Sequence, residues 1–166
     1  MNTAYLCRLL DYNYWAHRRV WDCVMALSEE QFTQSTDYSI GSVQAQVVHT
    51  MGAEWLMLSR AKGTPIQRIP PKENYPNREV IRAHWDKLEA EWRDFLASLS
   101  DADLMREVEY TSFVGNTVRR TPILDLFMQA INHSTDHRAQ TLALIHRLGG
   151  KTVEQDWIFY AWEHPL

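Results

Sequence analysis

The chain has 166 residues, 45% of them hydrophobic, and its 21 acidic and 17 basic residues give a net charge of −4. The acidic balance argues against a nucleic-acid-binding protein, because phosphate recognition depends on a basic surface. No apolar run is long enough to cross a bilayer. We therefore expect a single globular domain over residues 1–166 that binds neither nucleic acid nor membranes.

The N-terminal residues and the cysteines indicate a cytoplasmic protein. The segment MNTAYLCRLLDYNYW meets charge and polarity too early for a secretory signal. Cys7 and Cys23 fall on nearly opposite faces of one expected helix, where they cannot form a disulfide with each other. A reduced, cytoplasmic chain is the simplest interpretation.

Two helices are expected in the first part of the chain. The first runs from about Thr3 to Leu27, and Ser-Glu-Glu-Gln at residues 28–31 predicts a capping box that opens a short extra turn. The inward stripe of the first helix is Leu6, Leu10, Asn13, His17, Val20, Val24 and Leu27. The second helix runs from Ser42 to Ala61. A glycine within it, Gly52, should let a neighbouring helix approach closely.

A proline-rich connection over residues 65–76 follows, too rich in helix breakers for a helix or a central strand. The third helix is expected from the N-cap Asn77 to Leu99. Its inward stripe is wholly apolar: Ile81, Trp85, Leu88, Trp92, Phe95 and Leu99. We therefore expect this helix to supply no metal ligand.

The last long helix is preceded by a predicted hairpin. Alternating side chains on both sides of Gly115-Asn116 indicate two short strands. Thr121 is expected to cap the fourth helix, with Pro122 at its first position, and the helix should run to Leu148. The pattern of four amphipathic helices with two long connections predicts an all-α four-helix bundle with a small hairpin-like excursion before the last helix.

Three histidines interrupt apolar stripes on two of these helices. His133 and His137 lie one turn apart on the fourth helix, and His49 lies on the second. A single histidine on an apolar face is more often a hydrogen-bonded core residue than a ligand. Three such residues on two helices favour a divalent metal ion, which would satisfy all three imidazoles at once.

Other polar residues on the inward stripes are candidates for the same pocket. His17, Asn13 and Gln140 could line it, with His17 as a base that faces the substrate or, equally, as a satisfied boundary histidine. No helix carries the Glu-x-x-His repeat of a di-iron bundle, so a ferritin-like oxidase is not expected.

The sequence resembles the DinB/YfiT-like family of metal-binding four-helix bundles. The resemblance is carried by residues 11–19 (DYNYWAHRR), 47–56 (VVHTMGAEWL), 132–140 (NHSTDHRAQ) and 156–160 (DWIFY), in the expected order. The third segment is the most specific, because an H-x-x-x-H-R-x-Q run is a hallmark of the family.

The resemblance implies an up-down-down-up bundle, usually a homodimer, that holds nickel or zinc. The family's three metal ligands correspond to His49, His133 and His137, with no departure at these positions. It also implies coordination positions left open to water. Some relatives use such a site to activate a low-molecular-weight thiol, and one is described as a metal-dependent hydrolase.

These observations leave more than one function open. The leading hypothesis is a metal-dependent enzyme of the thiol S-transferase type, acting on a small thiol and an electrophile, with hydrolase chemistry second. The competing hypothesis is a non-catalytic, stress-related metal-binding or interaction module. Imidazole ligands suit nickel, zinc, copper and iron alike, so the residues alone do not identify the metal.

Overall fold

The computed structural model describes residues 2–66 and 68–166 and is mostly helical. Its four long helices are α1 (Thr3–Met25), α3 (Val43–Ala61), α4 (Arg78–Ala97) and α5 (Ile123–Arg147). The shorter elements are α2 (Glu29–Thr33), α6 (Trp157–Glu163), the 3₁₀ helices η1 (Lys72–Asn74) and η2 (Asp101–Met105), and the strands β1 (Glu107–Thr111) and β2 (Val118–Pro122). The prediction of a mainly helical chain is confirmed.

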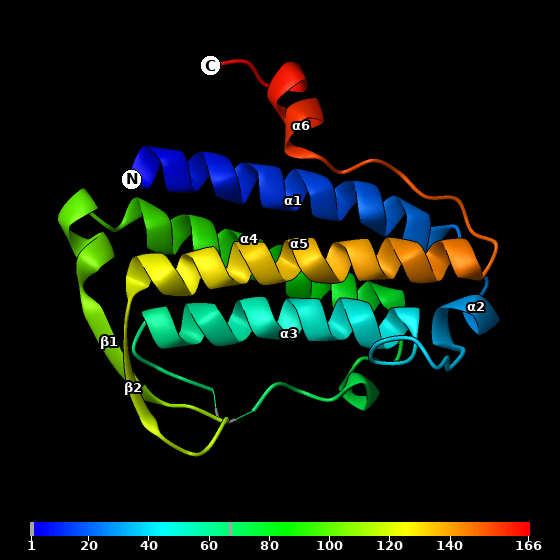
Figure 1. The fold of residues 1–166 in the computed structure, drawn as a ribbon, viewed down its shortest axis with the longest axis horizontal. Helices are drawn as coiled ribbons and strands as arrows, with labels where there is room; N and C mark the ends of the chain where they lie inside the picture. Colours follow the sequence, from blue (N-terminus) through cyan, green and yellow to red (C-terminus); the bar gives the residue numbers. More distant parts are fainter. Residues whose placement is uncertain (1, 67) are drawn as a thin grey trace.

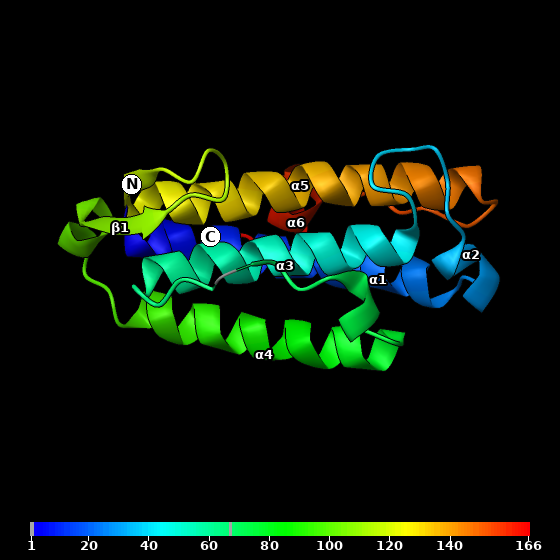
Figure 2. The same ribbon diagram turned by 90° about the horizontal axis from the view of Figure 1, so that it is seen from below.

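The four long helices lie side by side, with α1 and α5 running in one direction and α3 and α4 in the other (Figures 1 and 2). The most extensive contact is between α3 and α5, and α1 contacts both α4 and α5. Most residues of α3 are buried, including polar ones. The helix with the most buried residues, α3, therefore packs chiefly against α5.

The helix starts follow from local capping signals in the sequence. Asn2, Ser42 and Asn77 each accept a hydrogen bond from a backbone N–H in the first turn of α1, α3 and α4. The predicted capping box of Ser28 and Gln31 opens α2. These caps satisfy backbone donors that have no partner within the helix.

The predicted inward stripe of α1 is buried along its whole length. Asn13 and His17 are 1% and 4% exposed, as deeply buried as the leucines and valines around them. On α4, Ile81, Trp85, Leu88 and Trp92 are buried and Phe95 is partly buried, as is Leu99, which was expected on this helix but follows its end. The core is thus apolar along most of α4 and contains polar groups where α1, α3 and α5 meet. The indole N–H of Trp85 on α4 bonds to one of these groups.

The predicted hairpin is present, and it is longer on its second side than expected. β1 pairs with β2 in antiparallel register, with Tyr110 opposite Arg119. Gly115 and Asn116 both have positive φ, as a tight turn requires. Thr121 and Pro122 belong to β2, so the prediction that they open the fourth helix is wrong. Pairing with β1 outweighs the local helix-start signal, and α5 begins at Ile123.

Gly52 allows a close approach, but the approaching segment is a loop and not a helix. A Cβ atom at residue 52 would lie 2.4 Å from Cγ2 of Ile69, which belongs to the connection between α3 and α4. Residues 68–76 of this connection run back along α3 (Figure 1). The glycine therefore lets the connection pack directly against α3.

The C-terminal segment adds a short helix that the sequence patterns did not predict. Tyr160 of α6 packs against Tyr12 and Trp15 of α1 in edge-to-face aromatic contacts. Among the described residues, no helix has both the length and the apolar character needed to cross a membrane.

Candidate metal centre

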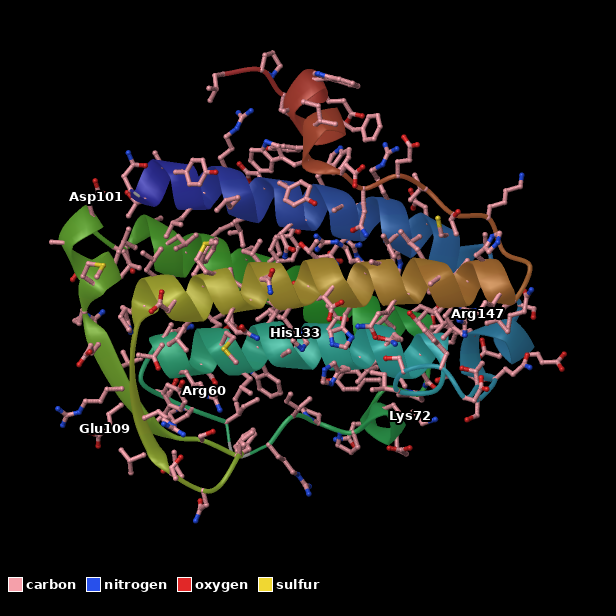
Figure 3. All side chains as sticks on the ribbon, in the orientation of Figure 1. Arg60, Lys72, Asp101, Glu109, His133 and Arg147 are labelled. Atoms are coloured by element: carbon pink, nitrogen blue, oxygen red, sulfur yellow. The ribbon has the colours of Figure 1, made fainter. Side chains whose placement is uncertain are left out.

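The structure brings His49, His133 and His137 together between α3 and α5. One ring nitrogen from each residue lies within 4.8 Å of the other two. Figure 3 shows His133 between the ribbons of α5 and α3. The three residues meet because α3 and α5 share the largest helix contact, and because His133 and His137 stand one turn apart on the same face.

The spacing of the nitrogens fits a single metal ion. Nε2 of His49 lies 3.2 Å from Nε2 of His133. Two metal–nitrogen bonds of about 2.1 Å at a tetrahedral angle would place their nitrogens about 3.4 Å apart. The pair of His49 and His133 therefore already has the separation that one ion requires, and a ring nitrogen of His137 lies within 4.8 Å of both.

The tautomer of His137 is set by a neighbouring amide. Nδ1 of His137 lies 2.9 Å from Oε1 of Gln46 on α3. The amide oxygen can only accept, so Nδ1 carries the proton and Nε2 keeps a free lone pair. Partners of this kind typically orient metal-binding histidines and make them more basic.

The contacts of His133 argue against an ordinary hydrogen-bonded core histidine. Within the described part of the chain its Nδ1 is buried without a hydrogen-bond partner. Its Nε2 faces only another imidazole nitrogen, that of His49. An ion would replace this nitrogen–nitrogen contact with two favourable bonds.

All three imidazoles are held in the neutral form that binds metal. Burial lowers the pKa of His49, and the neighbouring His137 lowers it further. Burial, His137 and His49 together lower the pKa of His133 to about 4. Burial also lowers the pKa of His137. Near neutral pH, no proton has to leave these rings before a metal ion binds.

Gln140, a predicted pocket residue, is linked to the site through Gln46. Its Oε1 accepts hydrogen bonds from Ser39 Oγ and, at 3.4 Å, from Gln46 Nε2. Gln140 Nε2 donates to Asp136 at 3.0 Å. Gln140 thus supports the residue that orients His137.

His17 and Asn13, the other two predicted pocket residues, bond to a buried carboxylate. Nε2 of His17 lies 2.6 Å from Oε1 of Glu54, and Nδ2 of Asn13 donates to the same oxygen at 2.9 Å. Asn13 also accepts a hydrogen bond from Arg138 at 2.5 Å. These contacts favour a structural role for both residues, and a part in the chemistry stays a prediction.

Glu54 lies at the centre of this polar cluster and is 1% exposed. Besides the groups on His17 and Asn13, it accepts hydrogen bonds from Ser134 at 2.5 Å, from Trp85 Nε1 at 3.1 Å and from the hydroxyl of Tyr14 at 3.2 Å. Burial raises the pKa of this carboxyl, but His17 and the hydrogen-bond donors outweigh it and hold the pKa at about 2.

Sequence reasoning missed Gln46 and Glu54. Gln46 stands three residues before His49 on the same helix face, but this spacing does not indicate its contact with His137 on α5. Glu54 continues the apolar series Val43, Val47 and Met51 of α3, where an acidic residue needs buried partners. The helix expected over residues 77–99 corresponds to α4. The three-histidine group contains no residue of α4, and the absence of a ligand from this helix stays a prediction.

The contact between Gln46 and His137 gives a first testable prediction. Replacing Gln46 by alanine should lower the affinity for zinc by about 10- to 100-fold, because the imidazole loses its fixed tautomer and orientation. Competition with a chromophoric chelator measures this affinity. The exposed Gln34→Ala variant is the control and should bind zinc as tightly as the wild type. An unchanged affinity in Gln46→Ala would show that the amide does not support the site.

Comparisons with known proteins agree with this picture. The family model described as the DinB family matches residues 1–165. Among solved structures, a DinB-like protein from Bacillus cereus ATCC 10987 is 18% identical, covers 88% of this chain and 94% of its own, and superposes with a TM-score of 0.66.

A conserved protein from Enterococcus faecalis is 13% identical, covers 84% of this chain and 94% of its own, and also gives a TM-score of 0.66. At these identities the likeness concerns the fold. No curated protein matches the sequence. With a family model that matches nearly the whole length, the chain belongs to the DinB family.

Proposed function

We propose that the protein binds one divalent metal ion through His49, His133 and His137 and is a metal-dependent enzyme that activates a small thiol, with transfer of the thiol sulfur to an electrophile as its reaction. The observation that carries this proposal is the convergence of three imidazole nitrogens, without a carboxylate among them, within 4.8 Å. We also propose that the four long helices form the up-down-down-up bundle of the family.

The donor set supports catalysis over a purely structural site. Three neutral imidazoles leave the full charge of the ion in place, and three protein ligands leave at least one position open. When bound there, a divalent ion supplies Lewis acidity that lowers the pKa of a thiol or a water molecule. His49 and His133 are only partly buried, so the open side can reach solvent.

The surrounding residues orient the three imidazoles in the folded chain before a metal ion binds. Gln46 holds His137 with one nitrogen free, and the packing of α3 on α5 fixes the separation of His49 from His133. Ser134 and Arg138, each next to a histidine in the sequence, are tied to the buried cluster of α1 and α3 through Glu54 and Asn13. The turn of α5 that carries His133 and His137 is therefore anchored to α3 through Ser134 and to α1 through Arg138.

The experiment that tests the proposal uses cobalt as a spectroscopic probe. The wild-type chain should take up one Co²⁺ per chain, and a small thiol such as mercaptoethanol should then produce a sulfur-to-metal absorption band. His133→Ala should lose stoichiometric uptake, whereas His146→Ala, at an exposed position of α5, should retain it.

The outcomes separate the candidate functions. Metal uptake and a thiol band, followed by turnover with an electrophile, would support the transferase. Metal uptake without any response to thiols would contradict it and leave a metal-dependent hydrolase or a non-catalytic module. Absence of uptake by the wild type would remove the basis of both.

A further inference from the structure

A cavity of about 180 Å³ lies beside one of the three histidines. His49 and Val48 of α3 form one side of it, and Ile69, Pro70 and Lys72 of the connection between α3 and α4 form the other. Figure 3 shows Lys72 on this connection, which lies along α3. The cavity therefore has a metal-binding side chain, an apolar wall and one cationic group.

The wall formed by the connection contacts α3 at three points. Ile69 packs onto Gly52, which stands one turn after His49 and has no side chain to hold it away. At one end of the connection, the backbone N–H of Ile66 donates to Ser59 Oγ at 3.2 Å. At the other end, the carbonyl of Tyr75 accepts from Gln44 of α3 at 3.0 Å.

Lys72 carries a positive charge in the wall of the cavity. Lys62 and Lys87 both pair with Glu91, whereas Lys72 has no carboxylate partner among the described residues. Its ammonium group is a compact point charge on a flexible chain, suited to an anionic group on a ligand. The neighbouring wall offers only aliphatic surface, which suits an apolar body.

We propose that this cavity binds the organic part of the substrate and selects small thiols that combine an apolar body with an anionic group paired to Lys72. The inference rests on the proposed function, because it places the sulfur end of the molecule at the three histidines. The aliphatic body then lies against Ile69 and Pro70, and the anionic end reaches Lys72. Lys72 is in this sense a specificity-determining residue.

The test compares matched thiols on cobalt-loaded protein, with the absorption band as the measure of binding. Mercaptohexanoate and mercaptohexanol share the thiol and the chain and differ in charge. The first should bind wild type about 2- to 5-fold more tightly, as expected for a partly exposed ion pair, and this preference should shrink at high salt. Mercaptohexanol should in turn bind more tightly than mercaptoethanol, by up to about fourfold for each methylene buried.

Two variants locate the effects. Lys72→Gln should abolish the preference for the carboxylate and leave mercaptohexanol binding unchanged, whereas Lys151→Gln, at an exposed site beyond α5, should keep the preference. Ile69→Ala should weaken both long thiols by a similar factor. Circular dichroism confirms that each variant is folded.

Different binding results would contradict the cavity proposal and the proposed function. Bands for all thiols with equal affinities, or a carboxylate preference that survives in Lys72→Gln, would overturn the cavity proposal and leave thiol activation standing. No band with any thiol would overturn the proposed function and the cavity proposal with it.

Discussion

Replacing Glu54 by alanine should lower the free energy of unfolding by about 3–5 kcal/mol, the loss expected when one partner of a buried charged network is removed. The change leaves five donors from three helices facing an empty space. It also leaves the guanidinium group of Arg138, which is 2% exposed, without the carboxylate that balances its charge through Asn13. Urea unfolding followed by circular dichroism measures the loss.

Glu54→Gln is the matched variant and should lose less stability than Glu54→Ala. An amide oxygen in the position of Oε1 can still accept from Asn13, His17 and Ser134. The amide nitrogen would then face the indole N–H of Trp85, which can only donate. The exposed Glu30→Ala should stay within about 0.5 kcal/mol of wild type. A loss below about 1 kcal/mol for Glu54→Ala would contradict a central role for the carboxylate.

This cluster shows where sequence reasoning reached its limit. The stripe of α1 predicted that Asn13 and His17 point inward, and both are buried. The apolar series of α3 indicates that Glu54 needs buried partners, but α3 is buried on nearly all sides, so the series does not indicate which neighbouring helix supplies them. A buried polar residue can be located from its own helix, but its partner is defined only by how two helices pack.

The three histidines could be predicted from the sequence more readily than Gln46, which orients one of them. His133 and His137 are one turn apart, so their common face follows from helix geometry alone. Their convergence with His49 depends on the contact of α3 with α5. The family resemblance implied this contact, whereas the spacing of the histidines along the sequence does not determine which helices pack together. Gln46 had no distinguishing pattern, because glutamine is common on helices and its role appears only in its contact with His137.

Two local signals were outweighed by contacts distant in sequence. Thr121-Pro122 is a good helix start, yet both residues pair with β1, where the hydroxyl of Thr121 lies 3.0 Å from that of Tyr110. Gly52 indicated a close approach, but only the structure identifies Ile69 as the residue that approaches. Local propensity is a weak prior when tertiary pairing competes with it.

The affinity for zinc should be nearly constant around neutral pH and should fall steeply in acid. The fall occurs over the pH range in which the folded histidines take up protons. The unfolded pKa of histidine is about 6.5, and the folded pKa of His133 is about 4. Burial also lowers the pKa of His49 and of His137 in the folded chain. Each ring that takes up a proton costs up to about tenfold in affinity for every further pH unit. Zinc titrations at fixed ionic strength, from neutral pH to about one unit below the folded pKa of His133, measure this curve.

The same shifts fix the sign of the effect on stability. A histidine whose folded pKa is lowered contributes stability that is present above the unfolded pKa of about 6.5 and is lost as the pH falls through the folded pKa. For His133 the loss extends from about pH 6.5 to about pH 4, and bound metal should deepen it because the ion needs the neutral ring. His133→Ala should remove the zinc-dependent part of this loss, whereas His146→Ala should keep it. Zinc affinity that stays level to well below pH 4, where the folded His133 ring is protonated, would show that the ion is not held by these imidazoles.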